Sequence, residues 1–393
     1  MIRLALFLLT LSAYGQPVTP PVHLTGPGNN IEYSSVTAFS ATSKYVMTSD
    51  LDSAVNIYDR ASGKLVYISV PQVNIAYAWW DPKNNEKIWY VYGAQIFSRI
   101  LNTGVVTLVA DLSKPAGNRP AMPDLQQGNG TGDVTQDGYL AIMSRQARTL
   151  CAVNLTGLTP ANQESHIRCA SYDSGGMSDV NYVDMAKLDS VSKKHYLLAS
   201  AVPSSVVFSI GAKGLDVEYA LPSGPFDYGI TPHSAIGSTP DGQAFVVWSR
   251  YNTANRYDVV AAFFNKGAKL MDSAVYLYPS NLGGSGAHFG ATAKGVIVHS
   301  IYDAVPDMPV DPLRNSIIVT EWGKKPRIIA NHGSNAMADY WATPRASISR
   351  DGKYVAYVSN MGAKKPASVY VVPTTAKPPT TAQRLTDDQV ESR

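Results

Sequence analysis

The sequence predicts an all-β fold, a single seven-bladed β-propeller of four-stranded antiparallel blades, and three observations support this prediction. A short turn motif that ends in Asp-Gly occurs three times, and the turns Ala41–Lys44, Pro82–Asn85 and Thr292–Gly295 occupy equivalent places. Each turn is followed by short apolar runs, and the predicted units repeat at intervals of roughly 41 to 55 residues. Four strands that share one hairpin signature at such a spacing are typical of propeller blades.

The turns carry the repeat most clearly. Thr135–Gly138, Thr239–Gly242 and Ser349–Gly352 each consist of a hydroxyl residue, a variable residue, Asp and Gly. Asp-Gly is a strong hairpin signal, because both central residues of the tight turn that it favours need positive φ. An apolar strand follows each turn, as at Tyr139–Met143 and Tyr354–Val358. We therefore expect each turn to join strand A, the innermost strand of a blade, to strand B.

Two further runs, strands C and D, complete each predicted blade. In the first blade they are Ala54–Tyr58 and Leu65–Val70, and in the second Gln95–Ile100 and Val105–Ala110. Helical periodicity is not sustained after the first residues, and Pro and Gly recur too often for long helices. The alternatives are a six- or eight-bladed ring and an array of β-sandwiches. The A strands are expected to begin near Ser34, Ile75, Gly130, Asp179, Thr231, Ala287 and Tyr340.

The N-terminus has the features of an export signal. Arg3 precedes the apolar run Leu4–Leu11, and Ala13–Gly15 is a small-x-small cleavage site. Val22–Thr25 and Gln383–Thr386 resemble each other and an outer strand, so either segment is a candidate to close the ring. The predicted domains are a signal peptide at 1–15, an N-terminal extension or closing strand at 16–33, the propeller at 34–386 and a C-terminal tail at 387–393.

The amino-acid composition limits which classes of binding partner we expect. Charged residues make up 16% of the chain and the net charge is +3, which does not favour nucleic acid or an anionic membrane surface. Beyond the signal, no apolar run is long enough for a spanning helix. We expect a secreted or periplasmic monomer without a membrane span, whose partner is a polysaccharide or an envelope protein.

The chain has two cysteines, Cys151 and Cys169. They lie in two short strand-like runs, Arg148–Asn154 and His166–Tyr172. In an oxidising compartment a disulfide between them is the expected state, and a pair of buried free thiols is the alternative.

Three segments carry a resemblance to known proteins: Phe39-Ser40 with Lys44–Val46, Thr239–Gly242, and Ser349–Tyr357. They resemble the TolB-like and WD-repeat-like propellers of bacterial envelopes. Such propellers include scaffolds, peptidase domains and polysaccharide lyases of the oligogalacturonate-lyase kind, so the resemblance implies a fold rather than one function.

Topology predicts which end of the propeller carries the site. The A-to-B turns emerge at one end of the central channel, the A-B end. The D-to-A and B-to-C loops emerge at the other, the D-A end. Because the A-B turns are short and chemically plain, whereas long polar loops converge on the opposite mouth, we expect the ligand site at the D-A end.

On this basis we predict which residues of the D-A end are catalytic and which bind the ligand. The predicted catalytic residues are His233, His288, Tyr340 and Arg345. The predicted ligand-binding residues are Arg145, Tyr182, Arg250, Tyr251, Tyr302 and Asp339. Alternatively, a divalent metal is held by His233, His288 and His332. The competing interpretation of each His is a hydrogen-bonded core position, and that of Arg345 is a tie between blades.

Two functions are compatible with these residues. The first is a secreted propeller that binds a glycan or a protein at the D-A mouth, where Tyr-rich loops offer contact area. The second is a lyase for a uronate-containing polysaccharide, which needs a cation for the uronate carboxylate and a base for the neighbouring proton. Arg345 or Arg250 would be the cation, His233 or His288 the base, and Tyr340 the acid. A glycoside hydrolase needs two channel carboxyl groups, and the candidates are Asp179, Asp184, Asp303 and Asp339.

Overall fold

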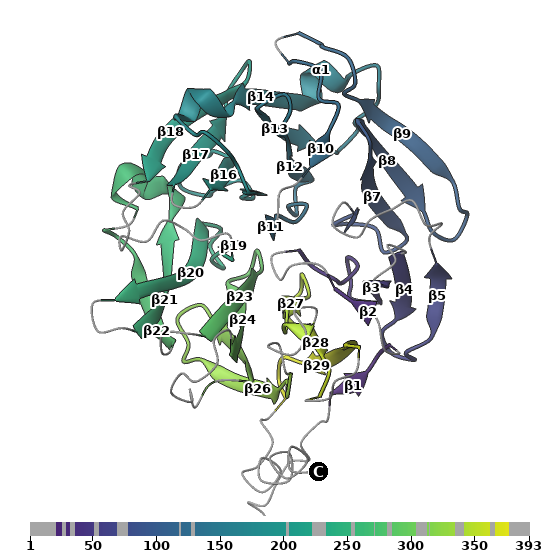
Figure 1. Cartoon of the computed structure of the whole chain (residues 1–393), viewed down its shortest axis with the longest axis vertical. Helices are drawn as coiled ribbons and strands as arrows, with labels where there is room; N and C mark the ends of the chain where they lie inside the picture. The colour runs from purple at the N-terminus through teal and green to yellow at the C-terminus, as the bar shows by residue number, and fades with distance from the viewer. Residues whose placement is uncertain are drawn as a thin grey trace, which may run out of the picture.

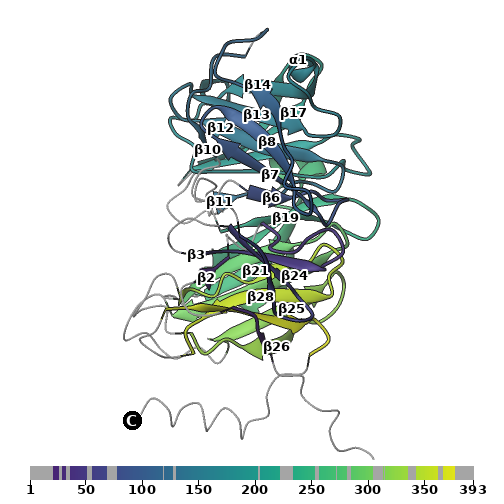
Figure 2. The ribbon, with the colours of Figure 1, turned by 90° about the vertical axis from the view of Figure 1, so that its right-hand side faces the viewer.

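In the computed structural model, seven β-sheets surround a central channel (Figure 1), and the ring is flatter than it is wide (Figure 2). Each sheet is a four-stranded antiparallel blade, and one blade carries a fifth strand in addition. The fold class and the blade number predicted from the sequence are therefore confirmed. The structure describes residues 21–376 except 26–28, 32–35, 51–54, 69–77, 118, 127–129, 202–203, 222–232, 253–255, 271, 281–284, 304–312, 314, 335–341 and 362–365.

The first four blades run from the inner to the outer strand as follows. Blade 1 contains β2 (Asn29–Asn30), β3 (Tyr45–Asp50), β4 (Val55–Asp59) and β5 (Leu65–Ile68). Blade 2 contains β6 (Ala78–Trp80), β7 (Lys87–Tyr92), β8 (Gln95–Ile100) and β9 (Val106–Asp111). Blade 3 contains β10 (Leu125–Gln126), β12 (Tyr139–Ser144), β13 (Thr149–Asn154) and β14 (Ile167–Ser171). Blade 4 contains β15 (Tyr182–Met185), β16 (Tyr196–Ala201), β17 (Ser204–Ile210) and β18 (Leu215–Leu221).

The remaining blades complete the ring. Blade 5 contains β19 (Ala235–Ser238), β20 (Ala244–Asn252), β21 (Arg256–Phe263) and β22 (Val275–Ser280). Blade 6 contains β23 (Ser285–Ala291), β24 (Val296–Asp303), β25 (Ser316–Glu321) and β26 (Arg327–Asn331). Blade 7 contains β27 (Ser347–Ile348), β28 (Tyr354–Ser359), β29 (Ser368–Pro373) and β1 (Val22–His23). The described helices are α1 (Gln163–His166) and the 3-10 turns η2 (Tyr172–Gly175) and η3 (Phe264–Lys269), and none is long and apolar enough to cross a membrane.

The N-terminal strand closes the ring. Val22 and His23 of β1 pair antiparallel with Val371 and Tyr370 of β29, so the outer strand of the last blade comes from the start of the chain. This selects Val22–Thr25 between the two closing segments that the sequence offered. The other segment, 383–386, and the predicted signal, 1–15, lie outside the described residues.

The inner strand of blade 3 departs from the prediction. It begins at β10, before the expected start near Gly130, and Gly130 itself lies in β11 (Gly130–Thr131), which pairs in parallel with β15 of blade 4. Gly132 permits this approach, because a Cβ at that position would lie 2.0 Å from Oδ1 of Asp184. Blade 1 likewise begins at β2, before the expected start near Ser34.

The A-B turns use one hydrogen-bonding scheme. The Thr135 hydroxyl donates to Oδ1 of Asp137 (2.6 Å) and accepts the main-chain N–H of Tyr139 (2.8 Å). The same pair of bonds recurs at Thr239 and Ser349, where the hydroxyl accepts the N–H of Gln243 and of Lys353 respectively. Only the closing glycine of each motif has positive φ, so the expectation that both central residues adopt it is wrong. The turn is a longer loop that ends in a left-handed glycine.

Turn carboxylates also connect neighbouring blades. The second oxygen of Asp137 accepts hydrogen bonds from the main chain of Leu188 (3.1 Å) and from the His195 ring (2.9 Å), both of blade 4. Asp189 of blade 4 accepts the N–H of Ala244 at the start of β20 in the same way (2.7 Å). Each of these bonds satisfies a buried or half-buried polar group at the seam between two blades.

Cys151 and Cys169 form the predicted disulfide. The two residues lie directly opposite each other in the antiparallel pair β13–β14. A disulfide is typical of proteins in an oxidising compartment, which is compatible with the predicted location outside the cytoplasm.

Candidate functional site

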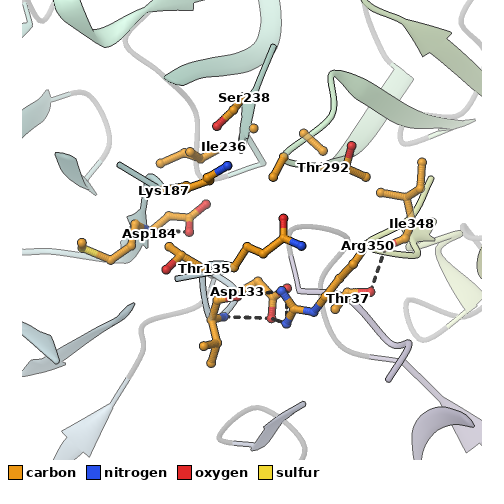
Figure 3. Close-up of a pocket in the computed structure, with 16 residues that line it drawn as sticks. Thr37, Asp133, Thr135, Asp184, Lys187, Ile236, Ser238, Thr292, Ile348 and Arg350 are labelled. Carbon is orange, nitrogen blue, oxygen red and sulfur yellow. Dashed lines mark hydrogen bonds and ion pairs between the residues drawn. The ribbon is translucent and has the colours of Figure 1, made fainter. Parts of the chain in front are cut away.

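The A-B end of the channel contains a cavity, which we call the A-B cavity (Figure 3). The cavity together with the open solvent at its mouth occupies about 630 Å³. Six blades contribute to its wall, and its polar side chains are those of Thr37, Asp133, Thr135, Gln136, Asp184, Lys187, Ser238, Thr292 and Arg350. The expectation that this end is chemically plain is therefore wrong.

Asp133 and Arg350 form an ion pair inside this cavity. Nη2 of Arg350 lies 2.8 Å from Oδ2 and 2.9 Å from Oδ1 of Asp133, and Nη1 donates to the carbonyl of Val134 (2.8 Å). Burial raises the pKa of Asp133 to about 6, although the positive charge of Arg350 acts in the opposite direction. Asp133 is therefore ionised at neutral pH and cancels the charge of Arg350.

Asp184 is the second carboxyl group of the cavity, and its side chain is buried. The Tyr182 hydroxyl donates to its Oδ2 (2.8 Å) and the N–H of Met185 donates to its Oδ1 (2.7 Å). Burial raises the pKa of Asp184 to about 8 against these hydrogen bonds, and the charge of Asp133 adds to the effect of burial. Asp184 is therefore mostly protonated at neutral pH.

Lys187 follows β15 and reaches into the A-B cavity from the side opposite Arg350 (Figure 3). Its ammonium group forms no hydrogen bond or ion pair with any residue that the structure describes. The Nε–H of Arg350 is buried and likewise has no partner within the described chain. The cavity thus combines unused donors with one cation that no described carboxylate balances.

At the D-A end, three rings lie in a row that we call the ring stack. The ring centroids of His233 and His288 are 4.6 Å apart, and those of His288 and Tyr302 are 5.2 Å apart. His233 is half-buried, whereas His288 and Tyr302 are buried. The structure therefore brings together three residues that the sequence placed in one site.

Electrostatics link Arg345 to this stack. Burial lowers the pKa of His288 well below its ordinary value, and the positive charges of His233 and Arg345 lower it further. His288 is therefore neutral at neutral pH. Arg345 precedes β27 and is itself buried.

His332 does not join this group as a metal ligand. Its Nε2 lies 2.8 Å from the carbonyl oxygen of Ile301, and its Nδ1 lies 2.9 Å from the N–H of Ser334. These partners assign the neutral tautomer with the proton on Nε2. No group of three or more His, Cys, Asp or Glu side chains within the described ranges is arranged to hold a metal. The residues therefore do not fit the predicted three-histidine metal site.

The other predicted site residues that the structure describes do not belong to the ring stack. Nη2 of Arg145 donates to Oδ1 of Asn181 (2.8 Å) at the rim of the D-A end. Tyr182 is fully buried and uses its hydroxyl on Asp184, so its side chain belongs to the wall behind the A-B cavity. Arg250 lies in β20 and is half-buried. The Tyr251 side chain and the residues Asp339 and Tyr340 lie outside what the structure describes.

Sequence reasoning missed Asp133, Lys187 and Arg350. Arg350 occupies the variable position of the turn motif, where the other two copies have Gln and Pro. A long cation at that position is the one signal that an A-B turn carries chemistry. The sequence offers Asp184 only as one of four candidate carboxyl groups for a glycoside hydrolase, although a charged residue between Val183 and Met185 indicates a special environment.

The fold and the two polar regions define this chain as a seven-bladed propeller with a polar cavity in its channel. Among solved structures it is similar to an oligogalacturonate lyase in complex with manganese, with 10% sequence identity and a TM-score of 0.52 over 92% of this chain and 98% of that one. It is also similar to the oligogalacturonate lyase of Vibrio parahaemolyticus, with 10% identity and a TM-score of 0.52 over 90% and 94% of the two chains. No protein-family model matches the sequence, and no curated protein matches it. At this identity the likeness shows the fold alone, and it confirms the resemblance to lyase-type propellers only at that level.

Proposed function

We propose that this chain is an extracytoplasmic propeller that binds an acidic saccharide at the D-A end, with Arg345 and the ring stack at the centre of the site. The observation that carries the proposal is the buried cation Arg345, whose charge acts on the ring stack. Burial is the largest cause of the low pKa of His288 and disfavours any charge there, whereas the charges of His233 and Arg345 lower that pKa further. A cation in a site of low polarity attracts an anion.

The ring stack supports a saccharide rather than a small inorganic anion. His233, the half-buried member, is the ring that a ligand would meet first, and Tyr302 lies two rings away in the same row. Aromatic rings offer large, rigid contact area with little loss of conformational freedom on binding. The carboxylate of a uronate unit would be attracted to Arg345 while the sugar body packs against the stack.

A second candidate function is β-elimination on the same ligand, and the neutral state of His288 favours it. A ring nitrogen of His288 would take the proton on the carbon next to the uronate carboxylate. The electron pair would then form a carbon–carbon double bond, the glycosidic C–O bond would break, and the leaving sugar oxygen would take up a proton from water. Arg345 would stabilise the charge that develops on the carboxylate. Two solved structures with a similar fold are oligogalacturonate lyases, and this likeness of fold supports the same chemistry.

Calorimetric titration of the mature chain with a short oligogalacturonate, beside a neutral oligosaccharide of the same length, tests the binding function. We expect binding of the acidic ligand only, a loss of at least tenfold in affinity for Arg345→Gln, and partial recovery for Arg345→Lys. Arg148→Gln is the matched control, because Arg148 is an exposed arginine of the D-A end that pairs with Asp173. Equal affinity for both saccharides, or an equal loss in the control variant, would overturn the proposal.

The same samples separate binding from catalysis. Elimination creates an unsaturated product that absorbs ultraviolet light, and His288→Gln should abolish its formation while leaving a measurable affinity for the oligogalacturonate. Binding without product in the parent chain would identify a binding protein. Absence of both from a folded sample would remove both functions.

A further inference from the structure

The A-B cavity lies at the other end of the channel from the ring stack, and the proposed function does not use it. Its wall comes from six blades, so it is a feature of the closed ring rather than of one loop. Gln136 at its edge is exposed, and the cavity opens to solvent on the A-B side. A small molecule can therefore enter without passing the D-A end.

The charges of the cavity sum to one positive unit at neutral pH. Asp133 and Arg350 cancel each other as an ion pair at 2.8 Å. Asp184 is buried and accepts hydrogen bonds from Tyr182 and Met185, and burial keeps it mostly protonated because its pKa is about 8. Lys187 supplies the remaining charge, and no described residue pairs with it.

Two donors of the wall have no acceptor within the described chain. Both oxygens of Asp133 already accept hydrogen bonds from Arg350 and the main chain of Val134. The Lys187 ammonium and the buried Nε–H of Arg350 have no acceptor within the described chain. Lys187 is half-buried, whereas the Nε–H of Arg350 is buried, and a buried donor without an acceptor is rare in folded proteins because leaving it unpaired is costly.

We propose that the A-B cavity is a second binding site, and that it takes a small hydroxycarboxylate whose carboxylate group pairs with Lys187. A single negative charge matches the one unbalanced cation. The hydroxyl groups of the ligand would meet the polar wall that Ser238, Thr292 and Gln136 provide.

The charge count also argues against sulfate or phosphate. A second negative charge in this cavity would face the carboxylate of Asp133, which Arg350 only just balances. Like charges at close range in a site of low polarity raise the free energy of the complex. We therefore expect a monocarboxylate to bind more tightly than a divalent anion of similar size.

Asp184 makes this binding depend on pH. The charged and titratable groups around it are Asp133, Arg350, Lys187 and Tyr182. When Asp184 ionises with a pKa of about 8, the net charge of the cavity falls from one positive unit to zero. The affinity for a carboxylate should fall as the pH rises from 7 to 9, and Asp184→Asn should remove that dependence.

Calorimetry and ligand-observed NMR with D-glycerate and L-lactate test the proposal, with glycerol and sulfate as comparison ligands at constant ionic strength. We expect glycerate and lactate to bind in the millimolar range or tighter, and glycerol and sulfate to bind at least tenfold more weakly. Lys187→Gln should weaken glycerate binding at least tenfold, and Lys187→Arg should retain most of it. Lys187 makes no bond with the described chain, so its replacement leaves the fold intact.

Lys294→Gln is the matched control. Lys294 is exposed in the A-B turn of blade 6, at the same end, and does not line the cavity. An equal loss of glycerate binding in Lys294→Gln and Lys187→Gln would show only general attraction to a positive surface and would overturn the proposal. So would tighter binding of sulfate than of glycerate, or an affinity that stays constant between pH 7 and pH 9 in the parent chain. Because Lys187→Gln changes only the A-B cavity, the part of glycerate binding that this variant loses is distinguished from any binding at Arg345 of the D-A end.

Discussion

Asp133 and Arg350 are 217 residues apart in the sequence, yet Nη2 of Arg350 lies 2.8 Å from Oδ2 of Asp133. The ion pair connects the A-B turn of blade 7 to the segment between β11 and the A-B turn of blade 3, and Nη1 of Arg350 donates to the carbonyl of Val134. It therefore joins the last blade to the middle of the chain across the channel. Both side chains are largely withdrawn from solvent, with 11% and 20% exposed.

Arg350→Ala should destabilise the ring. Removing one partner of a buried ion pair leaves the other as an uncompensated buried charge, which costs about 3 to 5 kcal/mol. We expect a lower midpoint of urea unfolding at pH 7, and a smaller loss in the double variant Arg350→Ala, Asp133→Asn, because the remaining side chain is then neutral. Equal losses in the single and double variants would contradict this account of the pair.

Local chemistry made part of this structure predictable. The bonds at Thr135, Asp137 and Tyr139 lie within five residues, so the turn repeat and the blade count could be inferred from the sequence. The disulfide followed from two cysteines in neighbouring strand-like runs. In both cases the interacting groups are close in sequence, and their patterns carry the information.

The chemistry of the channel was not predictable in the same way. Alternation along an inner strand places Tyr182 and Asp184 on one face, but it does not say whether that face meets the D-A mouth or the A-B cavity. The sequence predicts Tyr182 at the D-A mouth, whereas its hydroxyl donates to Asp184 at the A-B cavity. The pairing of Arg350 with Asp133 depends on ring closure, which no local pattern specifies.

Asp184→Asn should stabilise the protein at neutral and alkaline pH. The folded-state pKa of Asp184 is raised to about 8 from its ordinary value of 3.8. Its contribution is therefore fully present below pH 3.8 and is lost as the pH rises toward 8, because the unfolded chain ionises first. We expect a gain on the order of 3 kcal/mol for the variant at pH 8 and none near pH 3.5, measured by thermal unfolding at both pH values. A gain of the same size at both would show that charge is not the cause.

The contribution of Asp137 to stability should depend on pH in the opposite direction to that of Asp184. Burial acts to raise its pKa, but hydrogen bonds from His195, Thr135 and the main chain of Leu188 outweigh burial and lower the pKa to about 2. Its stabilising effect is present above pH 3.8 and is lost as the pH falls toward 2. We expect Asp137→Asn to cost about 2 kcal/mol at pH 7 and to lose that penalty near pH 2. Acid unfolding curves of both proteins measure the difference, and Asp241→Asn, at the equivalent turn without a histidine partner in the described chain, is the comparison.

Replacing Cys151 and Cys169 by Ser should lower the free energy of unfolding, because the unfolded chain gains conformational freedom. The disulfide joins residues that are 18 apart, and closing a loop of this size removes entropy from the unfolded state worth about 3 kcal/mol. The folded pairing of β13 with β14 persists without the bond, because five residue pairs of that ladder hold the register. We therefore expect the double Ser variant to fold, with a lower unfolding midpoint in urea and an unchanged circular dichroism spectrum below the transition. The parent chain treated with a reductant should reach the same midpoint, and a reduced parent that keeps its full stability would show that the loop constraint contributes nothing.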